Sequence, residues 1–375
     1  MNKNLAAGDK APQPIPEVSD DSGPPADGTV RVTSPASLLA LVPNLLTFQP
    51  ARSLVVIGTA PPRGQVRLTL RYDLPDPPDP DVAREIARHA TGVLGAQRIE
   101  TAVAVGYGPG PLVTPVADAL RERAAATGLE ITEFLRAENQ RYWSYLCPDP
   151  ACCPAEGTPY DTDGAPAGAV SAAPVLASRE ELAATLAPVA GPDAELMAPA
   201  TRRAEERAVR LIERAGRTGH RAAARRLIAV AGVEAVTEVI AAYRRGDHVP
   251  AGDCAAWLTV VLRDLRVRDD AWCRMDPEHR RAHLRLWTDL TRLARPGYAA
   301  APASLLAFTA WQCGNGALAN VALDRALADD PQYTMAQLLR QAIDSGAPPS
   351  LARIPMTPEE VAASYDETYD DEMDE

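Results

Sequence analysis

Three cysteines lie close together in the middle of the chain, where four residues separate Cys147 from the adjacent pair Cys152 and Cys153. Thiolates are good ligands for Zn²⁺. The proline-rich turn 148–150 can bring Cys147 back towards the other two cysteines. The spacing therefore makes this segment a candidate zinc site. Because Zn–S bonds are about 2.3 Å long, sulfur atoms spread over more than about 7 Å cannot share one ion.

Two other interpretations of these cysteines stay open. No C-x2-C or H-x3-H pair lies nearby to complete a set of four ligands, and adjacent cysteines usually point in different directions. The thiols can instead form a redox or reactive pair, with a thiolate stabilised by the guanidinium of Arg141. They can also be small buried residues in a rigid turn, with no chemical role.

Basic and aromatic side chains come directly before the cysteines. Arg141, Trp143 and Tyr145 alternate along the chain and carry a cation and two aromatic rings. Such groups can bind a ligand through charge and ring contacts. We therefore predict that these three residues bind a ligand beside the cysteines.

Gly106 and Gly108 belong to a glycine- and proline-rich run between a predicted strand and a predicted helix. Ligands of α/β sheets commonly bind at the carboxyl ends of strands, and glycine lets a ligand approach the backbone closely. We therefore add both glycines to the candidate ligand-binding residues. However, Pro109 and Pro111 lack the N–H donors that a phosphate would use, so a simple tight connection is the competing interpretation.

Charged residues form two further patterns. His279 and His283 share a helix face at i, i+4 spacing, but the order does not match H-E-x-x-H, and neighbouring arginines favour a solvated basic face. A run of arginines within residues 202–226 is partly offset by glutamates, which favours an ion-paired surface. The alternative is an anionic partner for this run, such as the chain's own acidic end at 366–375.

Composition limits the class of protein. The chain has 375 residues and a formal net charge of −12. Nucleic acid is therefore an unfavourable partner, because binding it depends on neutralising phosphates. No window reaches the ~18 apolar residues of a membrane span, and the polar start of the chain lacks the apolar region of a signal peptide. We expect a cytoplasmic protein with its six cysteines as thiols, and a protein partner or self-association.

Apolar periodicity predicts an α/β domain at residues 30–160, after a disordered segment at 1–29. Its first helix should begin at Ser34-Pro35 and end at Pro43. The run Ser53–Gly58 predicts a strand buried on both faces, and residues 65–72 alternate as its antiparallel partner. Further elements alternate, which predicts a mixed sheet with packed helices: helix 81–92, strand 101–105, helix 114–127 and strand 129–135.

The second half predicts helices only. A linker at 161–177 leads to an all-α domain at 178–349, which a capping box at Ser178 begins, and an acidic disordered tail covers 350–375. Residues 302–313 and 317–328 resemble one tetratricopeptide-type hairpin, without the repeats of a solenoid. The other helices are expected at 200–215, 219–230, 232–245, 252–266, 277–294 and 334–344.

Three segments together resemble the actinobacterial family called domain of unknown function 4192. The resemblance spans about residues 30–349, and the cysteine segment is its most specific part. Tyr142 stands where the family pattern has tryptophan, which keeps an aromatic residue in place. The resemblance implies a cytosolic bacterial protein and carries no established activity or catalytic residues. The three segments are Ser34-Pro35 through Phe48-Gln49-Pro50 to Ser53–Val56; residues 141–145 with the three cysteines, Pro154 and Glu156-Gly157; and Leu305–Phe308 with Ala310-Trp311 and Gly316–Ala319.

The sequence contains no serine nucleophile elbow, no motif of paired catalytic carboxylates and no dinucleotide-binding fingerprint. This favours a non-catalytic binding or scaffold protein. The alternative is a metal-binding or thiol-dependent enzyme with a site at Cys147, Cys152 and Cys153. Both interpretations place residues 143–157, here named the cysteine loop, as a rigid segment docked on the sheet at the seam between the two halves.

Overall fold

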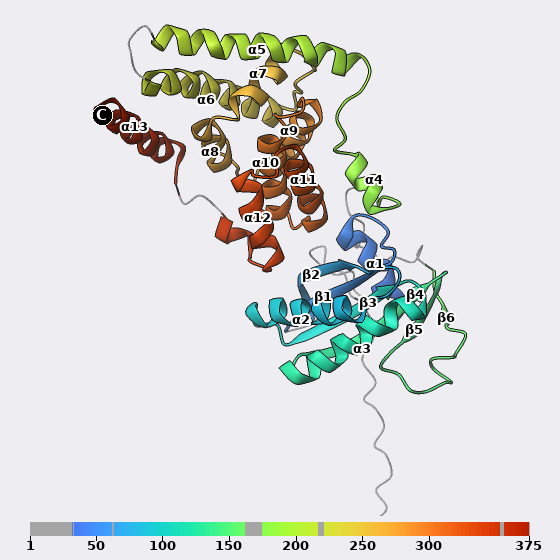
Figure 1. Cartoon of the computed structure of the whole chain (residues 1–375). Helices are drawn as coiled ribbons and strands as arrows, with labels where there is room; N and C mark the ends of the chain where they lie inside the picture. Colours follow the sequence, from blue (N-terminus) through green and yellow to red (C-terminus); the bar gives the residue numbers. More distant parts are fainter. Residues whose placement is uncertain are drawn as a thin grey trace, which may run out of the picture.

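The computed structural model describes residues 32, 34–61, 64–161, 175–216, 221–352 and 356–374. A mixed sheet with packed helices forms the first half, and helices form the second (Figure 1). This confirms the predicted fold class. The segment 1–29 and most of the expected linker at 161–177 lie outside the described residues.

The sheet has six strands in the order β2-β1-β3-β4-β5-β6. β1 pairs antiparallel with β2, as predicted, and also with β3, whereas β3 and β4 run parallel. β5 and β6 extend the sheet antiparallel beyond β4 and were not predicted, because they are too short to show an alternating pattern. The strands are β1 (Ser53–Ala60), β2 (Gln65–Asp73), β3 (Thr101–Tyr107), β4 (Glu130–Glu138), β5 (Arg141–Ser144) and β6 (Thr158–Pro159).

Helices cover both faces of the sheet, which explains the continuous apolar run in β1. Leu54 and Val56 lie in the apolar cluster with α2 (Pro80–Ala96) and α3 (Gly110–Thr127). Val55 and Ile57 lie in the opposite cluster with α1 (Pro35–Leu46). Successive side chains of a strand point to opposite faces, so a strand buried on both sides needs apolar residues throughout.

The first helix is longer than predicted. Ser34 caps α1 as expected, with its hydroxyl accepting a hydrogen bond from the Ser37 N–H. The expected end at Pro43 is wrong, because Pro43 lies inside α1, which continues to Leu46. Proline cannot donate the backbone bond of that turn, but the Asn44 side-chain amide donates to the Ala40 carbonyl at 3.0 Å.

The second half has ten described α-helices and one short 3₁₀ helix, η1 (Pro349–Ala352). The helices expected at 219–230 and 232–245 form one helix, α6, because Gly232 packs against Val261 and Val267 instead of ending it. The helix expected at 252–266 is two, because Asp264 caps a new helix, α8. The α-helices are α4 (Arg179–Ala184), α5 (Pro192–Gly216), α6 (Arg221–Arg245), α7 (Asp253–Val261), α8 (Leu265–Cys273), α9 (Arg280–Leu293), α10 (Ala300–Gln312), α11 (Gly316–Asp329), α12 (Thr334–Asp344) and α13 (Pro358–Asp374).

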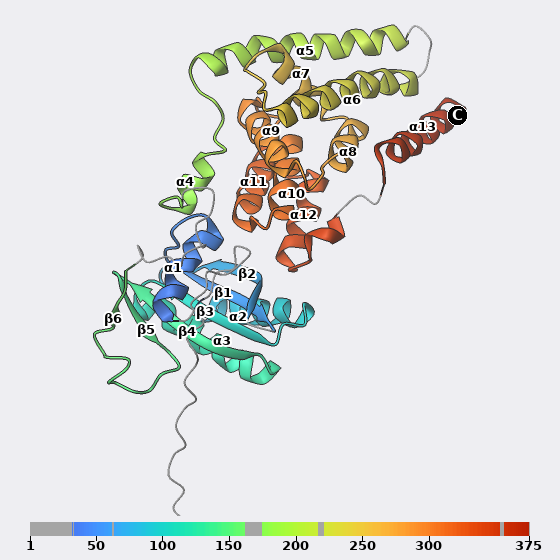
Figure 2. The ribbon, with the colours of Figure 1, turned by 180° about the vertical axis from the view of Figure 1, so that it is seen from behind.

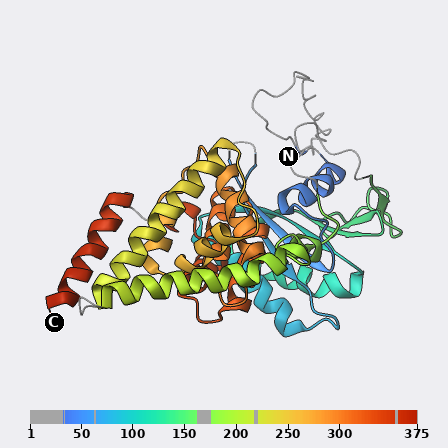
Figure 3. The same cartoon turned by 90° about the horizontal axis from the view of Figure 1, so that it is seen from above.

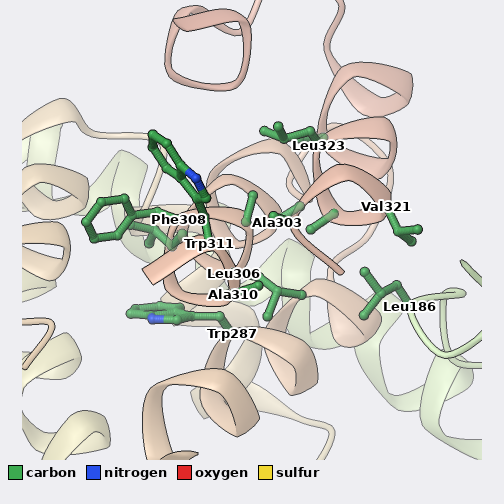
Figure 4. Packing of buried hydrophobic residues seen from close by; sticks show 14 of the residues in the cluster. Leu186, Trp287, Ala303, Leu306, Phe308, Ala310, Trp311, Val321 and Leu323 are labelled. Carbon is green, nitrogen blue, oxygen red and sulfur yellow. The ribbon is translucent and has the colours of Figure 1, made fainter. Parts of the chain in front are cut away.

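A single apolar cluster joins the two halves. It runs from α1 and one sheet face through Leu182 and Leu186, by α4, to the helical core. There Trp287 and Leu306 are fully buried, and Leu186 reaches the same group of side chains (Figure 4). Since α4 carries apolar residues from the sheet side into the helical core, the two halves share buried surface.

The end of the chain differs from the expectation of an acidic disordered tail at 350–375. α13 lies within this segment, and η1 overlaps its start. α13 has its own start signal, because the Thr357 hydroxyl accepts a hydrogen bond from the Glu360 N–H while the Glu360 carboxylate accepts one from the Thr357 N–H. This reciprocal capping box stabilises a helix even in an acidic segment.

Candidate metal centre

The cysteine loop connects β5 to β6 at the end of the sheet away from α5–α13, as opposite views of the ribbon show (Figures 1 and 2). Cys152 is exposed, and Cys147 and Cys153 are partly exposed. The expected position at the seam between the two halves is therefore wrong. β5 and β6 add to the outer side of β4, and this carries the loop beyond the sheet instead of under the helices.

The loop nevertheless brings the three thiols together. The sulfur atoms of Cys147, Cys152 and Cys153 all lie within 4.8 Å of one another, well inside the distance that one shared ion requires. They form the one group of three or more potential metal ligands among the described residues. The prediction that the turn returns Cys147 to the other two cysteines is confirmed.

Asp149 shapes the turn that gathers the thiols. Its carbonyl oxygen accepts hydrogen bonds from the N–H groups of Cys152 at 3.2 Å and Cys153 at 2.8 Å. Its carboxylate accepts a further bond from the Ala151 N–H at 2.8 Å. An aspartate that bonds the backbone two residues on stabilises a tight turn. This turn lets two adjacent cysteines face the same side as Cys147.

The first cysteine is anchored to the sheet through Ser144. The Ser144 hydroxyl donates to the Glu133 carboxylate at 3.1 Å and accepts from the N–H of Cys147 at 3.2 Å. Glu133 lies on β4, inside the sheet. The backbone of Cys147 is thus connected to a rigid element by two side chains.

Trp143 holds the far side of the loop. The Arg136 guanidinium carbon lies 3.6 Å from the Trp143 ring centroid, and the indole N–H donates to the Ala155 carbonyl at 2.9 Å. Gly157 sits against the ring with a φ of +80°. Two segments of the loop are therefore fixed on one aromatic ring.

The other predicted ligand-binding side chains also have partners within the protein. Arg141 donates to the carbonyl of Gly157 at 2.7 Å and to that of Glu156 at 3.3 Å. The Tyr145 hydroxyl is 2.9 Å from the Thr114 hydroxyl on α3. These contacts hold the loop to itself and to the sheet layer, while a ligand-binding role for Arg141, Trp143 and Tyr145 stays a prediction.

The thiols share protons unequally. A hydrogen bond from the Cys153 thiol lowers the pKa of Cys147 below its usual value. The same bond, with some help from burial, raises the pKa of Cys153 to about 12. The pair therefore holds one thiolate more readily than an isolated cysteine does. A metal ion would displace the shared proton, and the sulfur atoms of Cys147 and Cys153 would then bind the ion as thiolates.

Comparison with known proteins places this chain in a family. A family model described as domain of unknown function (DUF4192) matches residues 35–350. The chain belongs to the DUF4192 family. The matched region contains the sheet, the cysteine loop and the helices from α4 to α12, and it ends before α13. No curated protein and no solved structure matches the chain.

In this DUF4192 protein, side chains of α3 fill the space beside Gly106 and Gly108. Gly106 lies on β3, and a Cβ there would overlap a methyl group of Val113 on α3. Gly108 has a φ of +137°, and a Cβ there would lie 3.1 Å from a Leu112 methyl carbon. Both glycines let α3 pack closely on the strand. Their predicted contact with a ligand stays untested, and the geometry accounts for them as a tight connection.

The two histidines do not share a solvated face. His279 is exposed and bonds Asp276 at 3.0 Å, but His283 is buried and its ring nitrogens have no hydrogen-bond partner among the described residues.

One arginine of the run at 202–226 has a partner in the acidic end of the chain, because Arg226 pairs with Asp366 of α13 at 3.4 Å. The suggestion that the acidic end supplies an anion to this run is thus confirmed at one position.

Glu133, Ser144 and Arg136 are parts of this site that the sequence of the DUF4192 chain did not predict. Asp149 carries a local signal, because aspartate before proline favours a turn. Glu133 and Arg136 give none, since their contacts to the loop depend on the pairing of β4 with β5, whereas the Ser144 hydroxyl accepts from the Cys147 N–H only three residues away. No described helix of the protein is long and apolar enough to cross a membrane.

Replacing Gly157 by alanine is expected to loosen the cysteine loop. A Cβ at this position would lie 2.5 Å from Cε2 of Trp143, and the left-handed backbone disfavours any side chain. Overpacking and backbone strain each cost about 1–3 kcal/mol. We expect hydrogen exchange at the Cys152 and Cys153 amides to accelerate about tenfold or more.

The matched control is Gly128→Ala. Gly128 is the C-cap of α3 and has a φ of +75°, but a Cβ there would meet no atom within 4 Å. This variant bears the backbone strain without the ring overlap. Equal exchange of the loop amides in wild type and Gly157→Ala would show that the Trp143 contact does not hold the loop.

Proposed function

We propose that this DUF4192 chain is a non-catalytic binding protein whose cysteine loop holds one zinc ion. The observation that carries the proposal is the cluster of three thiols within 4.8 Å. In a tetrahedral zinc site with bonds of about 2.3 Å, ligand sulfurs are about 3.8 Å apart. The three sulfurs need only a small contraction to bind an ion, and a water or another donor would complete the shell.

The position of the loop supports a structural role for the metal. The loop extends from the last two strands of the sheet. On one side the Cys147 N–H donates to the Ser144 hydroxyl, and on the other the Trp143 indole N–H donates to the Ala155 carbonyl. A small exposed excursion gains little stability from apolar burial, so a metal that links its residues stabilises it directly. The zinc would fix the shape of this loop as a surface for recognition.

The binding partner is proposed to be a protein, in the cytoplasm of a bacterium. Reduced thiols and zinc–thiolate sites are compatible with that compartment. The hairpin of α10 and α11, which resembles a tetratricopeptide unit in sequence, supports a role in protein contacts. The negative net charge argues against nucleic acid as the partner.

Metal analysis of protein purified without a histidine tag tests the proposal. We expect about one zinc per chain in the wild type, as for a single structural site. The double variant Cys147→Ser/Cys152→Ser should lose it. Cys254→Ser is the matched control, because Cys254 is exposed on α7 and outside the thiol cluster, and its zinc content should equal that of wild type.

A thiol-dependent enzyme at the same loop is the second candidate, favoured by the lowered pKa of Cys147. A thiolate is the reactive form of cysteine, whereas burial raises the pKa of Cys254. Wild-type protein without zinc, in which iodoacetamide alkylates Cys147 much faster than Cys254, would favour this candidate. Wild-type protein with stoichiometric zinc that slows alkylation of Cys147 would favour the zinc site.

A further inference from the structure

The C-terminal helix α13 is docked on the helical part of the protein. It packs against α6 and α8, and the view from above shows it beside α6 (Figure 3). Val361 of α13 is only 2% exposed, so this apolar side chain is covered where α13 packs on the two helices. We name the surface of α6 and α8 that α13 covers the α6–α8 groove. Arg226 of α6 and Arg266 and Asp269 of α8 contact α13 there.

Charge complements the apolar contact. The Asp366 carboxylate lies 3.2 Å from the Arg266 guanidinium and 3.4 Å from that of Arg226. Arg266 is 8% exposed, whereas the side chains of Asp366 and Arg226 are 38% and 40% exposed, so the ion pair keeps partial contact with water. The Tyr365 hydroxyl donates to the Asp269 carboxylate at 2.7 Å. The groove therefore recognises an apolar residue, a tyrosine and an aspartate at positions i, i+4 and i+5 of a helix.

The family model covers the groove but not the helix that occupies it. The groove residues lie inside the region matched by the DUF4192 family model, which ends at residue 350, whereas α13 lies wholly outside it. α13 also carries its own capping box at Thr357 and Glu360. Because α13 has its own start signal and contacts the groove through a few side chains, a separate helix with the same residues could make the same contacts.

We propose that the α6–α8 groove is a binding site for an acidic amphipathic helix of a partner protein, and that α13 occupies it as a tethered competitor. A tethered segment acts at an effective concentration of up to about millimolar. A partner helix with the same pattern must outcompete α13 or bind after α13 is released. The groove thus binds its partner only when the chain's own end is displaced.

Binding of a fluorescein-labelled peptide with the sequence of residues 356–375 tests the proposal on the full chain. The variant Val361→Asp/Asp366→Arg should release α13 from the groove. We expect the peptide to bind this variant at least about tenfold more tightly than wild type, because the tethered competitor is gone. In a released variant with a neutral residue at position 366, Val361→Asp/Asp366→Ala, adding Arg266→Glu should abolish binding, because it puts a like charge opposite the peptide's aspartate.

A charge exchange guards against loss of the fold. A peptide carrying Asp366→Arg should bind the chain with Arg266→Glu better than the unmodified peptide does. If the double change in α13 prevents folding, the single change Asp366→Ala is used, with the same direction of effect. Equal binding to wild-type and released chains, or no effect of Arg266→Glu, overturns the proposal. Wild-type chains that dimerise by exchanging α13 would also overturn it, because the partner would then be a second copy.

Discussion

Replacing Gly106 by alanine is expected to lower the free energy of unfolding by about 2 kcal/mol, which is the usual range for overpacking a buried contact. The new Cβ would overlap one methyl of Val113, and rotating that side chain gives no relief. Its other methyl and its Cβ would lie only 3.2 and 3.3 Å away. The helix α3 must therefore move off β3. Urea unfolding followed by circular dichroism measures the change.

Two matched variants test the cause of this effect. Gly95→Ala lies on α2 with open space around it, so it should stabilise the protein by about 0.5–1 kcal/mol, as glycine replacement in a helix does. Val113→Ala should make the Gly106→Ala change less costly, with a coupling of about 1 kcal/mol or more. If Gly106→Ala leaves the free energy of unfolding unchanged, close packing does not explain this glycine, and contact with a ligand becomes the favoured interpretation.

Acid is expected to destabilise the wild type through His283. Burial, with a smaller effect from Arg244 and His279 that Asp276 partly opposes, lowers the pKa of His283 to about 4 from a usual value of 6.5. Between these two pH values the unfolded chain binds a proton at His283 and the folded chain does not. The free energy of unfolding therefore falls as pH decreases through this window. Between pH 7 and pH 5 the loss from this residue is about 2 kcal/mol.

The variants His283→Leu and His283→Phe should both lack this part of the pH dependence. Each removes two buried ring nitrogens without hydrogen-bond partners among the described residues, so at pH 7 neither should be strongly destabilised on polar grounds. The two replacements differ in shape, so a packing defect would affect them differently, but the loss of pH dependence must be common to both. If the wild type and both variants lose equal stability between pH 7 and pH 5, His283 does not titrate as described.

Local pattern in the sequence was enough for much of the α/β half. Ser34 before Pro35 predicted the start of α1 correctly, and the apolar run Ser53–Gly58 predicted a strand covered on both faces. The hairpin of β1 and β2 followed from a strand, a turn and an alternating strand. Each of these depends on neighbours within a few residues, which is the range over which caps and periodicity act.

The same local rules failed where distant contacts decide the outcome. Pro43 did not end α1, because Asn44 and the apolar cluster hold the last turn. The acidic end formed α13, because docking on α6 and α8 adds to the stabilisation from its capping box at Thr357 and Glu360. His283 was expected on a solvated face and lies in the core, since the packing of α9 decides which of its faces is covered.

For the candidate site, the residue types and spacing alone determined that Cys147, Cys152 and Cys153 could meet, because a short proline-rich turn limits how far apart they can be. Only the tertiary structure decided where they meet. β5 and β6 place the thiols at the outer end of the sheet instead of at the seam, and Glu133 and Trp143 hold the loop there. Distances within a turn are limited by the covalent chain, whereas the position of the turn depends on strand pairing between residues far apart in sequence.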